Sequence, residues 1–157
     1  TSAMARLSHM GYRNVHLVGN PGADYILHAN WKKEPPYPQP YVVVALYPET
    51  LKQDGAIEKN LKLAEAAIAG RPAYWVASNP DRLSDSIRGS TYTHDEFLNL
   101  IAFSDELIGN SSSILYEAPL LNIKTRMIGA RQRGRTIPMN DGNASERIAN
   151  ILQRIAI

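Results

Sequence analysis

The chain lacks cysteine altogether, and this absence limits its chemistry. None of the 157 residues is cysteine, so disulfide bonds and thiolate metal sites are excluded. Such a composition fits a reducing compartment, and we expect a cytoplasmic protein. Charge of one sign is also scarce, because 17 basic residues oppose 15 acidic ones for a net charge of +2. So small a surplus predicts neither nucleic acid nor an anionic membrane surface as a partner.

Long hydrophobic runs are missing too. No apolar stretch approaches the roughly 20 residues that a membrane-spanning helix needs, so we expect no membrane span. Residues 1–4 have no signal-peptide character, and we interpret them as a cloning remnant ahead of a single domain over residues 5–157. The four histidines are scattered without ligand spacing, which predicts no metal site. The sequence also contains no Gly-x-Ser-x-Gly motif of a serine hydrolase.

The sequence does contain an alternation of apolar runs and helical patterns. These predict strands at 15–18, 41–46, 73–77, 106–109 and 125–128, and helices at 23–30, 50–69, 95–103 and 143–155. Strands that alternate with helices favour right-handed crossovers and a sheet covered by helices. We therefore predict an α/β fold: a single Rossmann-like domain with a mostly parallel sheet of five or six strands and helices on both faces.

The segments that follow the predicted strands are expected to share one edge of the sheet. Ligands of parallel sheets bind at the carboxyl ends of the strands. Five segments follow predicted strands, namely 19–22, 47–50, 78–81, 110–113 and 129–135. The sequence therefore predicts a ligand site where these segments meet.

The most informative of these segments contains three serines in a row. Ser111, Ser112 and Ser113 lie between a predicted strand and a stretch with helical spacing. A helix N-terminus offers unpaired N–H groups and partial positive charge, so this arrangement can bind a phosphate. Glu117 follows about one helical turn later, where a carboxylate could accept hydrogen bonds from a ribose diol. The alternative is that the serines only cap the helix.

A basic loop follows the last predicted strand. Arg131, Arg133 and Arg135 alternate around Gly134. Arginine forks suit phosphate oxygens, but arginines that alternate in a loop also suit water. Both interpretations stay open from the sequence.

Several of these motifs, in this order, resemble a known family. The segments Val18–Gly22, Gly109–Ser113, Glu117–Pro119 and Ile128–Arg135 are similar to segments in the C-terminal half of the UDP-N-acetylglucosamine 2-epimerases. The likeness is greatest to the hydrolysing branch, which serves sialic-acid pathways, and it extends from about Arg6 onward. It implies half of a GT-B-like protein, in which two Rossmann-like domains face each other across a cleft and the C-terminal one holds UDP.

The resemblance also implies a role for each candidate site residue. The serines, together with Asn110 before them, would bind the diphosphate, and Glu117 would hold the ribose. Phe97 matches the position of an aromatic residue that lies against the uracil, and Arg131 and Arg135 match a basic motif that lines the cleft. The implied ligand is UDP or a UDP-sugar such as UDP-N-acetylglucosamine, with no additional cofactor.

Two departures from the family pattern argue against catalysis by this chain alone. The family usually has a histidine in a Leu-His-Pro motif after its second strand, whereas Tyr47 stands between Leu46 and Pro48 here. The family's acid and base carboxylates lie in an N-terminal domain, which we do not expect within these residues. The resemblance therefore implies a UDP-sugar-binding domain of an epimerase-like protein in carbohydrate metabolism, and we predict that the isolated chain is inactive.

Two alternatives stay open. The chain could be a non-catalytic binding module or remnant that forms a homodimer through an exposed interdomain face. It could also be one half of a split glycosyltransferase, with a separate N-terminal GT-B-type domain as its partner. The serines and Glu117 favour retained nucleotide binding, whereas Tyr47 favours a module without its own reaction.

Overall fold

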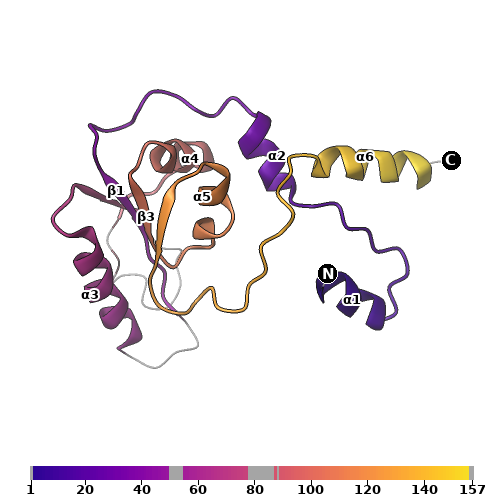
Figure 1. Ribbon diagram of the computed structural model, residues 1–157, viewed down its shortest axis with the longest axis horizontal. Coiled ribbons are helices and arrows are strands. Elements are labelled where there is room, and N and C mark those ends of the chain that lie inside the picture. Colours follow the sequence, from indigo (N-terminus) through magenta and orange to yellow (C-terminus); the bar gives the residue numbers. More distant parts are fainter. Residues whose placement is uncertain (1, 50–54, 78–86, 88, 156–157) are drawn as a thin grey trace. The chain divides into compact units, whose positions relative to one another are not determined.

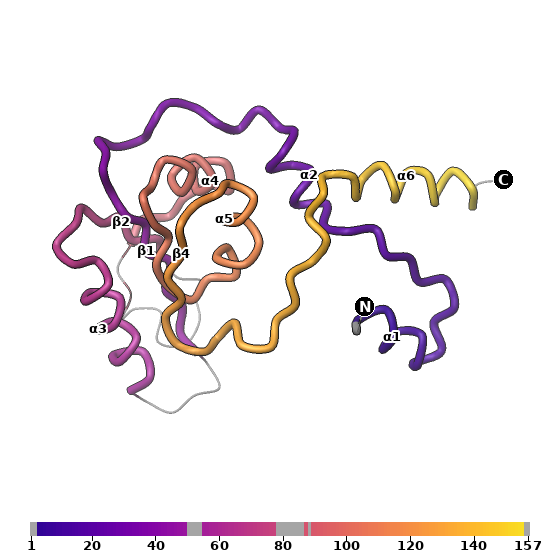
Figure 2. Tube along the Cα trace, in the orientation of Figure 1, coloured from indigo at the N-terminus to yellow at the C-terminus, as the bar shows by residue number. Residues whose placement is uncertain are grey.

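The computed structural model describes residues 2–49, 55–77, 87 and 89–155, and it contains two compact units (Figures 1 and 2). The smaller unit comprises Thr1–His28 with Pro138–Ile157, and the larger unit comprises Ala29–Ile137. The single domain expected over residues 5–157 stays a prediction.

The larger unit is built on a parallel sheet with the strand order β2-β1-β3-β4. Its strands are β1 Val42–Ala45, β2 Ala73–Trp75, β3 Glu106–Gly109 and β4 Lys124–Met127. All three pairings are parallel. The predicted α/β, Rossmann-like class is therefore confirmed, although the described sheet has four strands and not five or six.

The strand predicted at 15–18 accounts for the difference. These residues form no strand, and Leu17 is 52% exposed. They belong to the smaller unit, whose described residues include no strand that could pair with them. An apolar run becomes a strand only when a neighbour satisfies its backbone N–H and C=O groups. The prediction was wrong because the local pattern does not reveal whether such a neighbour exists.

Helices cover both faces of the sheet. Figure 1 shows α3 (Ala56–Ile68) on one side and α4 (His94–Ala102) and α5 (Glu117–Leu120) on the other. On the α3 side, Val42, Val44 and Ile108 pack in one cluster with residues of that helix. Because successive side chains of a strand point to opposite faces, the buried Val43 and Leu107 face the other layer. The helix predicted at 50–69 corresponds to α3, and residues 50–54 lie outside the described residues.

The smaller unit holds α1 (Ser2–His9), α2 (Pro21–His28) and α6 (Ala144–Ile155). The carboxylate of Asp24 on α2 accepts hydrogen bonds from the backbone N–H groups of Ala144, at 3.1 Å, and Ser145, at 2.5 Å. Hydrogen bonds with Ser145 hold the pKa of Asp24 below its usual range. An acid from one helix thus caps the N-terminus of another that lies far along the sequence. None of the described helices meets the length and apolarity that a membrane crossing requires.

A buried carboxylate at the start of β3 joins this strand to β4 and to the residue that lies two positions before β2. Glu106, which is 8% exposed at the start of β3, pairs with Arg71 at 2.7 Å and with Arg126 of β4 at 2.8 Å. Burial alone would raise the pKa of Glu106, but the hydrogen bonds from Arg126 and Arg71 outweigh it and lower the pKa. The ionised form therefore stabilises the folded state.

We predict a pH-dependent loss of stability in Glu106→Gln. Because the folded pKa lies below the ordinary value of 4.5, the contribution of Glu106 is fully present above that pH. It is lost as the pH falls through the folded pKa. At pH 7 the variant should lose roughly 1.5–3 kcal/mol of unfolding free energy in urea titrations, and the difference from wild type should shrink below about pH 4.5. Glu65→Gln, at an exposed position of α3, is the control and should change little. A difference that stayed constant down to pH 3 would contradict this account.

Candidate functional site

The site begins where β3 ends, at Gly109. A Cβ on this residue would lie 2.1 Å from the carbonyl oxygen of Ala45, and the backbone φ is +143°. Only glycine permits such a close approach in this conformation. As a result, the N–H groups of Asn110 and Ser111 both donate to the Ala45 carbonyl, at 3.1 and 3.2 Å. The carboxyl end of β3 is thereby fixed against that of β1.

Asn110 then fixes Tyr47, which lies two residues beyond the end of β1. Its fully buried side-chain amide accepts from the N–H of Tyr47 at 2.7 Å and donates to the C=O of Tyr47 at 2.8 Å. This pair of bonds is named the Asn110 clamp below. Asparagine suits the position because its amide carries a donor and an acceptor side by side. The predicted ligand-binding residue Asn110 therefore uses both amide atoms within the protein.

The backbone carbonyl of Asn110 also holds the basic loop. It accepts from Arg131 Nη1 at 3.2 Å and from Gln132 Nε2 at 2.6 Å. Gln132 is 5% exposed, and its Oε1 has no hydrogen-bond partner among the described residues. One residue thus joins the ends of two strands to the loop that follows a third.

The serine segment differs from its prediction. Ser112–Ile114 form a short 3-10 helix, η2, and α5 starts only at Glu117. Ser111 caps η2, since its Oγ accepts from the N–H of Ser113 at 3.2 Å. A helix therefore does begin at the serines, but it is a short 3-10 helix and not the continuous α-helix expected, and Ser111 acts as its cap, as in the alternative interpretation. A continuous helix would place Pro119, which has no N–H, opposite the carbonyl of Leu115, and serine side chains compete for the backbone groups.

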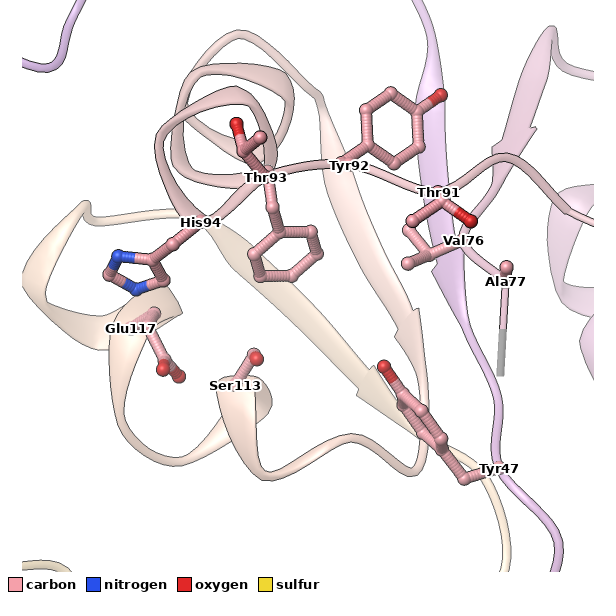
Figure 3. A pocket seen from close by; sticks show the side chains of 10 residues that line it. Tyr47, Val76, Ala77, Thr91, Tyr92, Thr93, His94, Ser113 and Glu117 are labelled. Atoms are coloured by element: carbon pink, nitrogen blue, oxygen red, sulfur yellow. The ribbon is translucent and has the colours of Figure 1, made fainter. Parts of the chain in front are cut away.

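A cavity of about 420 Å³ opens at the carboxyl ends of β1 and β2 and beside η2 and α5 (Figure 3). It is lined by Tyr47, Val76, Ala77, Thr91, Tyr92, Thr93, His94, Phe97, Ser113 and Glu117. Figure 3 shows Ser113 and Glu117 facing His94 across the space, with the hydroxyl of Tyr47 directed toward its interior. Aromatic rings, hydroxyl groups and one carboxylate therefore meet at the edge where parallel sheets bind ligands.

Glu117 is the only acidic residue among the described residues that line the cavity. Its Oε2 is buried and has no hydrogen-bond partner among the described residues. A buried carboxylate oxygen without a donor is costly. The arrangement is therefore suited to a ligand that brings hydrogen-bond donors to this point.

Tyr47 forms another part of the wall, and a cation lies close to its ring. The guanidinium of Arg131 is 5.1 Å from the ring centroid, within the range of a cation–π contact. Burial raises the pKa of the Tyr47 hydroxyl, against opposing effects of Arg131 and of a hydrogen bond with Ser111. Tyr47 therefore keeps its proton at neutral pH.

The structure brings together only some of the predicted site residues. Phe97, Ser113 and Glu117 all line the cavity, although they come from three separate elements. Ser111 is buried, while Ser112 and Arg135 are not among the lining residues. Arg135 is exposed in the basic loop, which agrees with the interpretation that the arginines of this loop contact water.

Two of the five segments expected at this edge cannot be placed there. Segment 19–22 follows no strand, so the reason for expecting it at the edge no longer holds. Segment 78–81 lies outside the described residues. No group of three metal-ligating side chains occurs in the described ranges.

The sequence analysis did not predict the wall of the cavity that is formed by the residues just before α4. Thr93 and Glu96 form a capping box, in which Thr93 Oγ1 accepts from the N–H of Glu96 at 3.3 Å and Glu96 Oε2 accepts from the N–H of Thr93 at 2.8 Å. The spacing Thr-x-x-Glu is a signal of a helix start that the sequence already contained. It identifies Thr93 as the residue that caps α4.

We predict that Asn110→Asp disturbs Tyr47. The aspartate loses the amide donor and sets an oxygen against the Tyr47 carbonyl, which should cost roughly 1–3 kcal/mol of unfolding free energy. Asn99→Asp is a matched control, because the buried Asn99 amide also binds two backbone groups, Lys33 N–H at 2.8 Å and Glu34 C=O at 3.0 Å. Both variants should lose stability on heating, but only Asn110→Asp should shift the NMR signals of the Tyr47 ring. Unchanged Tyr47 signals in Asn110→Asp would rule out the clamp as the device that positions this ring.

The chain has detectable relatives among known proteins. No family model matches it. It is 32% identical, over an alignment of 112 residues, to the polysialic acid biosynthesis protein P7 of Escherichia coli; the match covers 60% of this chain and 29% of that protein. The chain therefore spans less than a third of the length of this relative.

A solved structure shares the fold. It is that of a Listeria monocytogenes protein assigned as a UDP-N-acetylglucosamine 2-epimerase, with a TM-score of 0.59 and 11% identity. The match covers the whole of this chain and 50% of that one. The resemblance predicted from the motifs is thus confirmed for the fold: the chain is similar to half of a UDP-N-acetylglucosamine 2-epimerase.

Proposed function

We propose that the cavity binds a UDP-sugar of the UDP-N-acetylglucosamine kind, as part of an epimerase-like protein. The observation that carries this proposal is the carboxylate of Glu117, which lines a cavity at the strand ends and whose buried Oε2 has no hydrogen-bond partner among the described residues. A ribose diol presents two adjacent O–H donors to a carboxylate and so matches this acceptor. A free phosphate does not match it, because two negative charges would repel each other.

The other lining residues fit the remaining parts of such a ligand. Phe97 offers an aromatic face to the uracil, and the apolar side chain of Val76 lies in the same cavity. Ser113 offers a hydroxyl to the diphosphate. In this proposal Asn110, Ser111 and Arg131 support the site from behind, whereas Ser112 and Arg135 bind the ligand only if the basic loop and η2 shift.

The names of the two relatives support the proposal. One is named for polysialic acid biosynthesis and the other as a UDP-N-acetylglucosamine 2-epimerase. Each is at least about twice as long as the matched part. We propose that the other half of such a protein, supplied by another segment or another chain, closes the cleft over the sugar and supplies the base. A cysteine-free chain that binds a nucleotide sugar also fits the cytoplasm, where we propose that it acts.

The experiment that tests ligand binding is a calorimetric titration of residues 1–157 with UDP and with pyrophosphate. Half of a cleft buries only part of the ligand, so we expect a micromolar to millimolar Kd for UDP, about −8 to −4 kcal/mol. Glu117→Ala should weaken UDP by roughly 1.5–3 kcal/mol and should leave pyrophosphate unchanged or slightly tighter, because the lost carboxylate serves the ribose. Glu65→Ala on α3 is the control. No binding by the wild type at millimolar UDP would refute the proposal, and an equal loss for both ligands would mean that Glu117 acts through the fold.

We also predict that residues 1–157 do not epimerise or hydrolyse UDP-N-acetylglucosamine by themselves. The reaction needs a base at the sugar C2 and stabilisation of the departing UDP. Among the described residues that line the cavity, only Glu117 and His94 could act as a base, and Glu117 is assigned to the ribose. Binding without a positioned base gives occupancy and no turnover. Incubation in deuterium oxide, followed by NMR, should show neither deuterium at C2 nor UDP release above a protein-free control. Exchange at C2 that His94→Gln abolishes would show that the chain carries its own base.

A further inference from the structure

One segment of the smaller unit has the sequence of a strand but no strand beside it. Val15, Leu17 and Val18 belong to the run for which the sequence predicts a strand, and Leu17 is 52% exposed. Among the described residues, no backbone N–H group of segment 13–19 donates to another backbone group. Several backbone groups that a neighbouring strand would satisfy are therefore available along this segment.

The apolar side of α6 is only partly covered. Four apolar residues recur at the spacing of one helix face, namely Ile148, Ile151, Leu152 and Ile155. Within the smaller unit α2 contacts α6, and Ile148 and Ile151 are half-buried (Figure 1). Leu152 and Ile155, by contrast, are 59% and 69% exposed. A stripe of this kind normally packs on a protein core, so the last turns of α6 are suited to a further partner.

The segment and the helix belong to one arrangement within the smaller unit. The N–H of Asn20 donates to the carbonyl of Met139 at 3.0 Å, which joins the chain after the segment to the chain before α6. Arg147 of α6 donates through Nη1 to the carbonyl of Val18 at 3.2 Å. The two features thus form one surface, named the docking surface below, which consists of Val15–Val18, Leu152 and Ile155.

The available backbone groups indicate what kind of partner fits the docking surface. Two copies of segment 15–18 would form a ribbon of two short strands, which is marginal in water. The sheet of another copy is also a poor partner, because its edge strand β4 carries the exposed Lys124 and Arg126, and such charges oppose pairing. A different domain with its own sheet could accept segment 15–18 as an additional edge strand and cover the stripe of α6.

The matched proteins have room for such a domain. The whole of this chain, including the docking surface, matches 50% of the solved Listeria monocytogenes structure, so another half of that chain lies outside the match. The polysialic acid biosynthesis protein P7 extends still further beyond its matched 29%. The size of this additional part favours it over a second copy as the partner.

We propose that the docking surface binds the other half of an epimerase-like protein. Segment 15–18 joins the sheet of that half as an edge strand, and the exposed stripe of α6 packs on the same half. This inference rests on the proposed function, in which another half closes the cleft, and it adds the residues that attach this half. It also gives a reason for an apolar segment with a strand pattern in a unit whose described residues form no sheet.

The test co-expresses residues 1–157 with the Escherichia coli protein P7 from which the matched region has been removed. Light scattering after gel filtration should show a one-to-one complex. Leu17→Pro removes an N–H that strand pairing needs, and Leu152→Gln makes the stripe polar, so each should raise the Kd of the complex about tenfold or more. Neither change removes a backbone–backbone hydrogen bond or a buried side chain of the described chain. The unfolding temperature of residues 1–157 alone should therefore change by less than about 3 °C.

Leu63→Gln is the matched control, because Leu63 is also an exposed leucine of a helix, at 45% on α3 of the larger unit. It should leave the Kd of the complex unchanged. Absence of a complex with the wild type, or an equal loss in Leu63→Gln, would overturn the inference. A dimer of residues 1–157 alone that Leu17→Pro and Leu152→Gln dissociate would also overturn it, because a second copy would then occupy the docking surface.

The titration with UDP tests the proposed ligand separately, because all the described residues that line the cavity belong to the larger unit. UDP binding by residues 1–157 without formation of the complex would overturn this inference alone. Formation of the complex without UDP binding would overturn the proposed ligand and support the docking surface.

Discussion

The contact between Gly109 and the carbonyl of Ala45 sets the geometry of the sheet edge at which the cavity opens. With no side chain at Gly109, β3 ends close enough to β1 for two successive N–H groups to converge on one oxygen. That convergence turns Asn110 inward, where its amide binds Tyr47 and its carbonyl binds the basic loop. A larger residue at 109 would separate the strands and release each of these contacts in turn.

The resulting edge presents polar groups to the cavity with little exposed charge. The cation and the anion of this edge are separated. Arg131 lies over the ring of Tyr47, and the carboxylate that lines the cavity is that of Glu117, whose buried Oε2 has no partner among the described residues. Hydroxyl groups fill the wall in between. Such a site gains selectivity from where donors and acceptors are placed, because each buried group left unpaired by a wrong ligand costs free energy. The same argument applies to Gln132, whose amide oxygen is the other buried side-chain atom without a hydrogen-bond partner among the described residues.

The sequence predicted most of the larger unit and three of the ten described residues that line the cavity. The strand at 41–46 was clear because a central parallel strand is apolar throughout, and Phe97, Ser113 and Glu117 were found because helical spacing and strand ends place them. The strand at 15–18 failed because pairing is a tertiary property. The long helix expected after the serines is wrong because Pro119 and local side-chain bonds act against it. Segment 47–50 places Tyr47 at the predicted ligand edge, but the sequence does not reveal how this residue is held. Its clamp depends on a residue 63 positions away, which no local pattern contains.

The cap that Asp24 places on α6 has a consequence for how the chain folds. The two groups are 120 residues apart in sequence, and almost all of the chain between them belongs to the larger unit. An unfolded loop of that length would make closure entropically unfavourable, whereas a loop that has already collapsed brings its ends together at much lower cost. Contacts within the sheet unit are formed over shorter separations and should come first. The smaller unit then assembles after the larger one has folded. Protection of the amides at the N-terminus of α6 from exchange can therefore serve as a measure of the last step of folding.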